Sequence, residues 1–247
     1  IIGKTITYAN DDGDITWRQK ILLPVKPFDE ETTGTPLMEK IRTDYALPHS
    51  MTAYRIYDED YGLSPEKTPC TSDNVKNEWK NGYGMVVWGT HGSETIAASV
   101  FGNWMCGELD DTKPSFVFQL SCLNGKPSVT DNLGYSLLKH GAVATIAGTE
   151  ITYYWVSDFA LLTRLSNASV ARFYAKSIID GLTAGDALRQ AKIDSELSNL
   201  FTICPNFDKF QRAGWTNFLA FTLYGDPGVG LYDTGLGTPP VALGPSK

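Results

Sequence analysis

A histidine and a cysteine each follow a short apolar run of the chain. The run Met85–Trp88 leads into His91, which stands between small residues, and the run Phe116–Leu120 leads into Cys122. An imidazole near a thiol favours the thiolate, which is the attacking species, and can also protonate a leaving amine. The backbone N–H groups of Gly92 and Cys122 are available to hold an oxyanion. If the two runs are neighbouring strands, these residues predict nucleophilic acyl transfer.

Each of these residues also has a structural explanation. A single cysteine at a strand end is usually a small buried hydrophobe, and a lone histidine is usually structural. The occurrence of both at consecutive strand ends favours chemistry. His49 follows a proline in a loop, and His140 ends a predicted helix, where a cation suits the helix dipole. The remaining cysteines form no CxxC pair and have no histidine at metal-ligand spacing, which argues against a zinc site: Cys70, Cys106 and Cys204.

Apolar runs alternate with helix-like segments along most of the chain. Strands are predicted at residues 21–25, 52–57, 85–88, 116–120, 142–147 and 218–224. Helices are predicted at residues 32–45, 73–79, 133–140, 169–180 and 184–197, with Ser72 or Asp73 capping the second and Thr183 the last. Continuous apolar strands alternating with helices predict a parallel sheet covered on both faces, which is one α/β layer sandwich.

Composition and length limit the kinds of partner and the number of domains that we expect. The 247 residues carry a formal net charge of −7 and no run of Lys or Arg, so we expect no nucleic-acid partner. The apolar runs are too short to cross a bilayer, and no signal peptide is recognisable. Because the chain begins at Ile1 without Met, we expect a mature or truncated piece. We expect one catalytic domain or subdomain at residues 1–233 and a Gly/Pro-rich tail or linker at 234–247.

Several motifs together resemble the gingipain-type cysteine peptidases. "THGSET" resembles the family's His motif, with Thr90 in place of its first Gly, and "SCLNGKP" resembles its Cys motif. "NLGYSLLKHGAVATIAGTEITYYW" and "FTLYGDPGVGLY" resemble the segments that follow in the family, in the same order. The resemblance covers nearly the whole chain. It implies a caspase-like three-layer α/β/α sandwich with a mostly parallel central sheet.

The resemblance also implies the roles of the candidate site residues. His91 becomes the general base and acid, and Cys122 the nucleophile that forms a thioester before water hydrolyses it. The N–H groups of Gly92 and Cys122 become the oxyanion donors. Family members often place an acid near the histidine, and Asp29 is the nearest candidate here, followed by Glu30. A solvated acidic turn explains these two acids equally well.

A substrate preference follows from the same resemblance. Relatives that cleave after Arg or Lys hold that side chain with an acid in the pocket, and Glu150 is the best candidate here, ahead of Asp158. Trp155 resembles the aromatic residue that lids the pocket. These residues imply cleavage of proteins or peptides after a basic residue, although surface or packing roles explain them too. The motif "NAS" at Asn167 matches a glycosylation acceptor, a pattern common by chance.

Further expectations come from family habit. No cofactor is required, and structural Ca²⁺ is permitted, although no spaced ligand loop is visible. Complete catalytic domains of the family carry an additional subdomain before this point, so a missing N-terminal subdomain or a propeptide is an expected partner. The expected location is extracellular or at the cell surface of a bacterium.

Two alternatives to a peptidase stay open. Some gingipain-like proteins act as sortases, which pass the acyl group to an amine instead of water, and the sequence does not separate these outcomes. A non-catalytic caspase-like interaction module is the other alternative, against which the presence of both His91 and Cys122 argues. A nucleotide-binding protein is excluded, because the first strand leads into "KPFDEE" and not into a Gly-rich loop.

Overall fold

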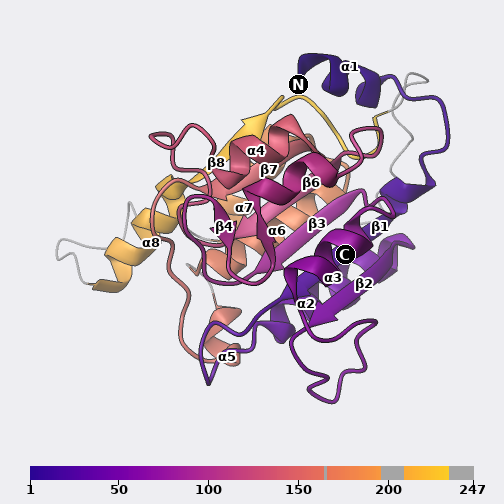
Figure 1. Cartoon of the computed structure of the whole chain (residues 1–247). Coiled ribbons are helices and arrows are strands. Elements are labelled where there is room, and N and C mark those ends of the chain that lie inside the picture. The colour runs from indigo at the N-terminus through magenta and orange to yellow at the C-terminus, as the bar shows by residue number, and fades with distance from the viewer. Residues whose placement is uncertain (164–165, 196–208, 234–247) are drawn as a thin grey trace, which may run out of the picture.

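The computed structural model describes residues 1–163, 166–195 and 209–233. Its centre is a six-stranded sheet with the spatial order β2-β1-β3-β6-β7-β8 (Figure 1). The first five strands in this order pair in parallel, and β8 pairs antiparallel to β7. The strands are β1 (Lys20–Val25), β2 (Thr52–Tyr57), β3 (Met85–Gly89), β6 (Ser115–Leu120), β7 (Ala142–Gly148) and β8 (Phe221–Gly225).

Helices cover both faces of this sheet, which gives three layers. The buried hydrophobic residues form two clusters, one on each face of the sheet. Helices α2, α6 and α7 contribute to one cluster, and α3 and α4 contribute to the other. The helices are α1 (Ile2–Ala9), α2 (Thr35–Ile41), α3 (Ser72–Trp79), α4 (Leu133–Lys139), α5 (Asp158–Leu161), α6 (Asn167–Ile179), α7 (Ala184–Asp194) and α8 (Lys209–Ala220). Short 3₁₀ or π turns occupy Thr16–Gln19, Arg42–Ala46, Leu47–His49 and Asn103–Glu108.

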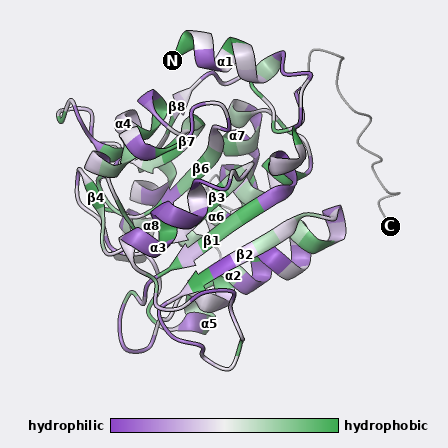
Figure 2. Cartoon of the chain, turned by 45° about the vertical axis from the view of Figure 1, so that its right-hand side comes forward, coloured by the Kyte–Doolittle hydropathy of each residue, from purple (hydrophilic) through white to green (hydrophobic). Residues whose placement is uncertain are grey.

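The burial of the strands explains their continuous apolar sequence. In β6, Phe116 and Phe118 belong to the cluster under α6, whereas Val117 between them belongs to the opposite cluster. Because both faces are covered, successive residues of a strand are all buried, and the run is apolar without alternation. Figure 2 shows the hydrophobic colour concentrated in the strands and the hydrophilic colour on the helices and loops.

The predicted fold class is confirmed, and the strand positions agree closely. Residues 218–220, predicted to begin the last strand, are the end of α8, and β8 begins at Phe221. The helix predicted at residues 32–45 begins at Thr35, and a π turn replaces its α-helical geometry after Ile41. The cap of α3 is also wrong, because the side chain of Thr71, and not Ser72 or Asp73, accepts from the N–H of Asn74. Thr183 caps α7 as predicted, by accepting from Asp186.

Two more features bear on the sequence-based predictions. A two-stranded hairpin, β4 (Ile96–Ala97) and β5 (Phe101–Gly102), was not predicted because each strand is only two residues long. The expected tail at 234–247, and the last residues of the helix predicted at 184–197, lie outside the described residues. In the part of the chain that the structure describes, no helix is both long and apolar enough to cross a membrane.

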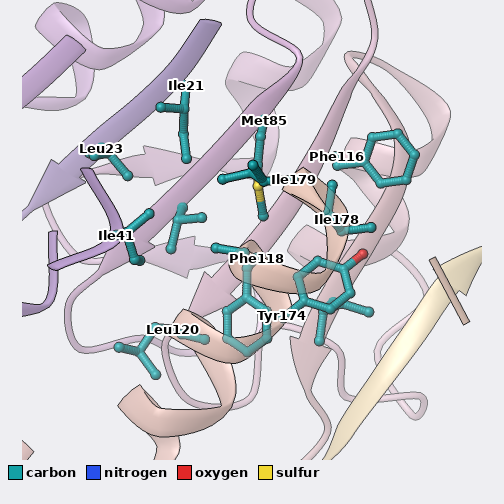
Figure 3. Close-up of a cluster of buried hydrophobic side chains, with 14 of the residues drawn as sticks. Ile21, Leu23, Ile41, Met85, Phe116, Phe118, Leu120, Tyr174, Ile178 and Ile179 are labelled. Carbon is teal, nitrogen blue, oxygen red and sulfur yellow. The ribbon is translucent and has the colours of Figure 1, made fainter. Parts of the chain in front are cut away.

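Phe118 lies at the centre of the larger core cluster (Figure 3). Its ring is fully buried and contacts the rings of Tyr174 on α6 and Phe221 on β8, with centroids 5.5 and 5.1 Å away. We expect Phe118→Ala to lower the free energy of unfolding by about 3–5 kcal/mol, because it leaves a cavity in the packed core. Urea denaturation measures this change.

The matched control is Phe159→Ala, because the side chain of Phe159 is 86% exposed. This control is expected to change the free energy of unfolding by less than about 0.5 kcal/mol. Equal effects of the two substitutions would contradict the described core.

Candidate active site

The parallel pairing of β3 with β6 brings His91 and Cys122 to one edge of the sheet. Gly89, the last residue of β3, lies opposite Leu120, the last residue of β6. The N–H of Thr90 donates to the carbonyl of Leu120 at 3.1 Å, so the segments that follow β3 and β6 begin side by side. The predicted adjacency of the two runs is therefore correct.

His91 and Cys122 line the same cavity, which has a volume of about 210 Å³ and is called the Cys–His pocket below. Its walls come from the ends of four strands and from the start of α6. Its full lining is Phe28, Thr90, His91, Ser121, Cys122, Ile151, Thr152, Tyr154 and Asn167. Polar groups at the carboxyl ends of neighbouring parallel strands, facing one concave space, are the usual arrangement of a site in an open α/β sheet.

The ring of His91 is oriented by a backbone carbonyl. Its Nε2 lies 2.6 Å from the carbonyl oxygen of Phe28, an atom that only accepts hydrogen bonds. Nε2 therefore carries the proton, and in the neutral ring Nδ1 is the free acceptor. The rings of Phe28 and Tyr154 pack edge-on against the imidazole, with centroids 6.1 and 6.3 Å away. The exposed side chain of His91 is thus held in one orientation.

Cys122 differs from the other described thiols in its access. Cys70 and Cys106 are buried, and burial raises the pKa of each to about 12, so both stay protonated near neutral pH. Cys122 is partly exposed and lines the Cys–His pocket. Its Sγ lies 3.5 Å from the carbonyl oxygen of Thr152. Cys204 lies outside the described residues.

The backbone of Gly92 packs closely against the backbone of Cys122. A Cβ atom on Gly92 would lie 2.8 Å from the carbonyl oxygen of Cys122 and 3.2 Å from its nitrogen, so this position requires glycine. Leu123 has a positive φ of 63°, which turns the chain sharply after the thiol. Among the hydrogen bonds of the described residues, none uses the N–H of Gly92 or of Cys122. Both donors are therefore available to an oxyanion.

Asn124 connects the loop that follows His91 to the loop that follows Cys122 by hydrogen bonds. Its fully buried Nδ2 donates to the carbonyls of Ser93 and Ile96, and its Oδ1 accepts from the hydroxyl of Ser121. That hydroxyl in turn accepts from the indole N–H of Trp88 at 3.0 Å. One buried amide thus sets the position of the residues after His91 relative to the residues after Cys122.

Asp29, the expected acid partner of the histidine, lies beside the site with its carboxylate turned to other groups. It accepts from the hydroxyl of Tyr154 at 2.7 Å and from the N–H of Glu31 at 3.0 Å. Its desolvation is outweighed by the hydrogen bonds from Tyr154 and Thr32, so the pKa of Asp29 lies below its ordinary value. The neighbouring carbonyl of Phe28, and not this carboxylate, meets the ring of His91.

The two expected substrate-binding residues lie outside the lining. Glu150 is exposed, and its carbonyl accepts from the N–H of Leu123, while the next residue, Ile151, lines the pocket. Trp155 is half-buried, whereas its neighbour Tyr154 lines the pocket. Asp158 accepts from the Thr33 hydroxyl at 2.6 Å and from a backbone N–H, and so ties two loops together.

Sequence reasoning assigned no site role to five residues that shape the pocket: Phe28, Ile151, Thr152, Tyr154 and Asn167. The aromatic run "YYW" was the available signal for Tyr154. The sequence marks Asn167 only through a glycosylation-acceptor motif. In the folded protein the side chain of Asn167 is 3% exposed and is therefore not accessible for glycosylation. Its position at the start of α6, facing the strand ends, depends on the folded topology.

No group of three or more His, Cys, Asp or Glu side chains in the described part of the chain could hold a metal ion. The structural calcium that the resemblance permits stays a prediction.

The substitution Asn124→Ala tests whether Asn124 holds the loop after His91 against the loop after Cys122. The substitution leaves the carbonyls of Ser93 and Ile96 without their donor, which costs about 1–3 kcal/mol for a buried acceptor. We expect a lower free energy of unfolding and, in the folded protein, at least about fivefold slower alkylation of Cys122 by iodoacetamide at pH 7, because thiolate formation depends on a nearby imidazole.

Asn81→Ala is the matched control, because Asn81 is exposed and donates only to Glu78. It is expected to change neither quantity. For Asn124→Ala, an unchanged rate of Cys122 alkylation would contradict the positioning role of Asn124, whether or not the free energy of unfolding falls.

The fold of this chain is similar to that of solved proteins. The structure of the Arg-specific cysteine proteinase gingipain R matches with a TM-score of 0.71 and 16% identity, over 95% of this chain and 52% of that one. The complex of the pro- and mature domains of that enzyme from Porphyromonas gingivalis matches with a TM-score of 0.68 and 16% identity, over 95% and 53%. The chain thus spans about half the length of these solved chains.

At this level of identity the structural matches show the fold alone. No curated protein matches the chain at a significant level. The family model for peptidase family C25 matches residues 1–232, which is nearly the whole chain. The chain belongs to peptidase family C25.

Proposed function

We propose that the protein is a cysteine endopeptidase that hydrolyses peptide bonds through Cys122 and His91. The single observation that supports this proposal most is that the thiol and the imidazole come from adjacent parallel strands and line one pocket. The orientation of the His91 ring adds support, because it leaves Nδ1 as the proton acceptor.

The proposed reaction has two acyl-transfer steps. Nδ1 of His91 takes the thiol proton, and the Cys122 thiolate attacks the carbonyl carbon of the peptide bond. The C–N bond then breaks as the imidazolium gives its proton to the leaving amine, which leaves a thioester. Water, deprotonated by the same imidazole, attacks the thioester and releases the acid and the thiol. In both steps, the N–H groups of Gly92 and Cys122 hold the oxyanion.

Asp29 takes an indirect part in this proposal. Its carboxylate holds the hydroxyl of Tyr154, whose ring packs against those of Phe28 and His91. The orienting hydrogen bond to His91 comes from the carbonyl of Phe28. Asp29 is thus a positioning residue that keeps an aromatic wall of the pocket in place.

The preference for a basic residue, implied by resemblance, depends on an acid in the pocket. The lining of the Cys–His pocket contains neither Asp nor Glu, and Glu150 lies next to it with an exposed side chain. Selection of Lys or Arg by Glu150 is therefore one hypothesis about the substrate, and it requires this side chain to turn toward the pocket.

Location and partners are proposed from the same relationship. We place the protein outside the cell or at its surface, as is usual for gingipain-type enzymes. One of the matched structures is a complex of pro- and mature domains, which supports a propeptide as a partner of this chain as well.

Selective alkylation tests the proposed pair. We expect iodoacetamide at pH 6 to 7 to label Cys122 much faster than Cys70 or Cys106, and His91→Ala to slow the labelling of Cys122 to that of an ordinary exposed thiol, because thiolate formation then lacks its base. In the same variant, and in Cys122→Ser, the kcat for cleavage of a protein substrate is expected to fall at least about a thousandfold.

His140→Ala is the matched control, since the ring of His140 is exposed and contacts Asp111. His140 precedes β7, whereas the pocket residues Ile151 and Thr152 follow the other end of that strand. It should keep both reactions. If Cys122 reacts no faster than an ordinary thiol in the unmutated protein, and no substrate is cleaved, the proposal is wrong and an interaction module is the better explanation.

Product analysis separates hydrolysis from transpeptidation. Both pass through the same thioester, so the acceptor decides the product. With a glycine-derived amine added at millimolar concentration, a hydrolase releases mainly the free acid, whereas a sortase-like enzyme releases mainly the new amide. Mass spectrometry of the acyl fragment distinguishes the two, and we expect the free acid.

A further inference from the structure

A buried amide group without a complete set of partners lies in the Cys–His pocket. The side chain of Asn167 is 3% exposed and belongs to the lining. Its Oδ1 is buried, and no group among the described residues donates a hydrogen bond to it. A buried carbonyl oxygen without a donor costs about 1–3 kcal/mol, and native proteins keep few of them. An unpaired acceptor beside a nucleophile therefore points to a ligand that supplies the donor.

The surrounding contacts hold this amide in place. The backbone N–H of Asn167 donates to the carbonyl of Tyr153 at 3.0 Å, and its Nδ2 donates to Oγ1 of Thr152 at 3.2 Å. Ser166 caps α6 at this point by accepting from the N–H of Ser169. Asn167 is thus fixed both through its backbone and through its side chain.

Thr152 supplies a second polar group to the same pocket. Its Oγ1 accepts from Asn167 and lies 3.9 Å from Sγ of Cys122. The hydroxyl proton can therefore be donated to an acceptor beside the thiol. The residue is 4% exposed, and its carbonyl oxygen lies 3.5 Å from Sγ of Cys122. A hydrogen-bond acceptor and a donor therefore lie side by side, next to the thiol.

The electrostatics of the pocket disfavour a charged side chain. The lining contains no carboxylate to pair with Lys or Arg, and burying an unpaired charge is costly. Asn167 is the first residue of α6, a helix of 13 residues, so the positive end of the helix dipole faces the pocket and also opposes a cation. Of the nearby acids, Asp29 and Asp158 are occupied by hydrogen bonds to neighbouring loops.

A neutral side chain with both a donor and an acceptor fits these groups. We propose that the Cys–His pocket binds the primary carboxamide of a glutamine or asparagine residue immediately before the scissile bond. The NH₂ group donates to Oδ1 of Asn167, and the carbonyl accepts from the hydroxyl of Thr152. The aliphatic part of the side chain packs between Phe28, Ile151 and Tyr154. This inference rests on the proposed peptidase function and names its substrate class.

The test uses fluorogenic peptides that differ only in the residue before the scissile bond: Gln, Asn, Glu, Leu, Lys or Arg. We expect kcat/KM for the Gln or Asn peptide to exceed that for Leu, Lys, Arg and Glu at least about tenfold, because the others leave buried polar groups unpaired. Asn167→Ala and Thr152→Val should each lower the ratio of kcat/KM for the carboxamide peptide to that for the Leu peptide about tenfold.

Asn167→Asp keeps the shape of the side chain and adds a charge. We expect it to shift the preference toward Lys and Arg, because the pocket then holds a carboxylate. Asn81→Ala, which alters an exposed asparagine, serves as the control for substitution itself. Thr152→Val and Asn167→Asp keep the test decisive if Asn167→Ala does not fold.

The outcomes separate the substrate class from the function. Preference for Lys or Arg that Glu150→Gln abolishes overturns the inference in favour of selection by Glu150. A carboxamide preference that survives both Asn167→Ala and Thr152→Val also overturns it. In either case, cleavage together with selective alkylation of Cys122 leaves the proposed peptidase function in place. Absence of both cleavage and selective alkylation overturns the two together.

Discussion

The hydrogen bonds between β3 and β6 run parallel and in register, so that Gly89 and Leu120 end their strands opposite each other. Every feature of the site depends on this pairing. Two residues that are far apart along the chain, His91 and Cys122, reach the same cavity because each follows its strand by two positions. A shift of one residue in this register would turn the side chains of one strand to the other face and separate the pair.

Hydrogen bonds between loops then fix what the sheet brings together. Asn124 joins the two loops that carry the reactive residues. The segment after β7 is joined to the loop after β1 by the hydrogen bonds of Tyr154 with Asp29 and of Asp158 with Thr33. The pocket therefore has walls from separate elements that are connected by buried or half-buried polar contacts.

Much of this architecture could be predicted from the sequence, since buried parallel strands are continuous apolar runs and the His and Cys motifs follow two of them. The end of α8 was predicted as strand because "FLAFTLYG" is one apolar run that spans two elements. Asn167 was out of reach for another reason. Its relation to Thr152 and Cys122 arises when α6 packs with its first turn against the strand ends, and no local pattern encodes that approach.

The orientation of His91 by the carbonyl of Phe28 has an evolutionary consequence. A main-chain oxygen is present whatever the side chain at that position, so no single amino-acid replacement can delete the group that selects the tautomer of the imidazole. Replacements at Phe28 or Asp29 can change the walls of the cavity while this proton arrangement persists. Variation in what the cavity accepts is thereby separated from the chemistry that the imidazole performs.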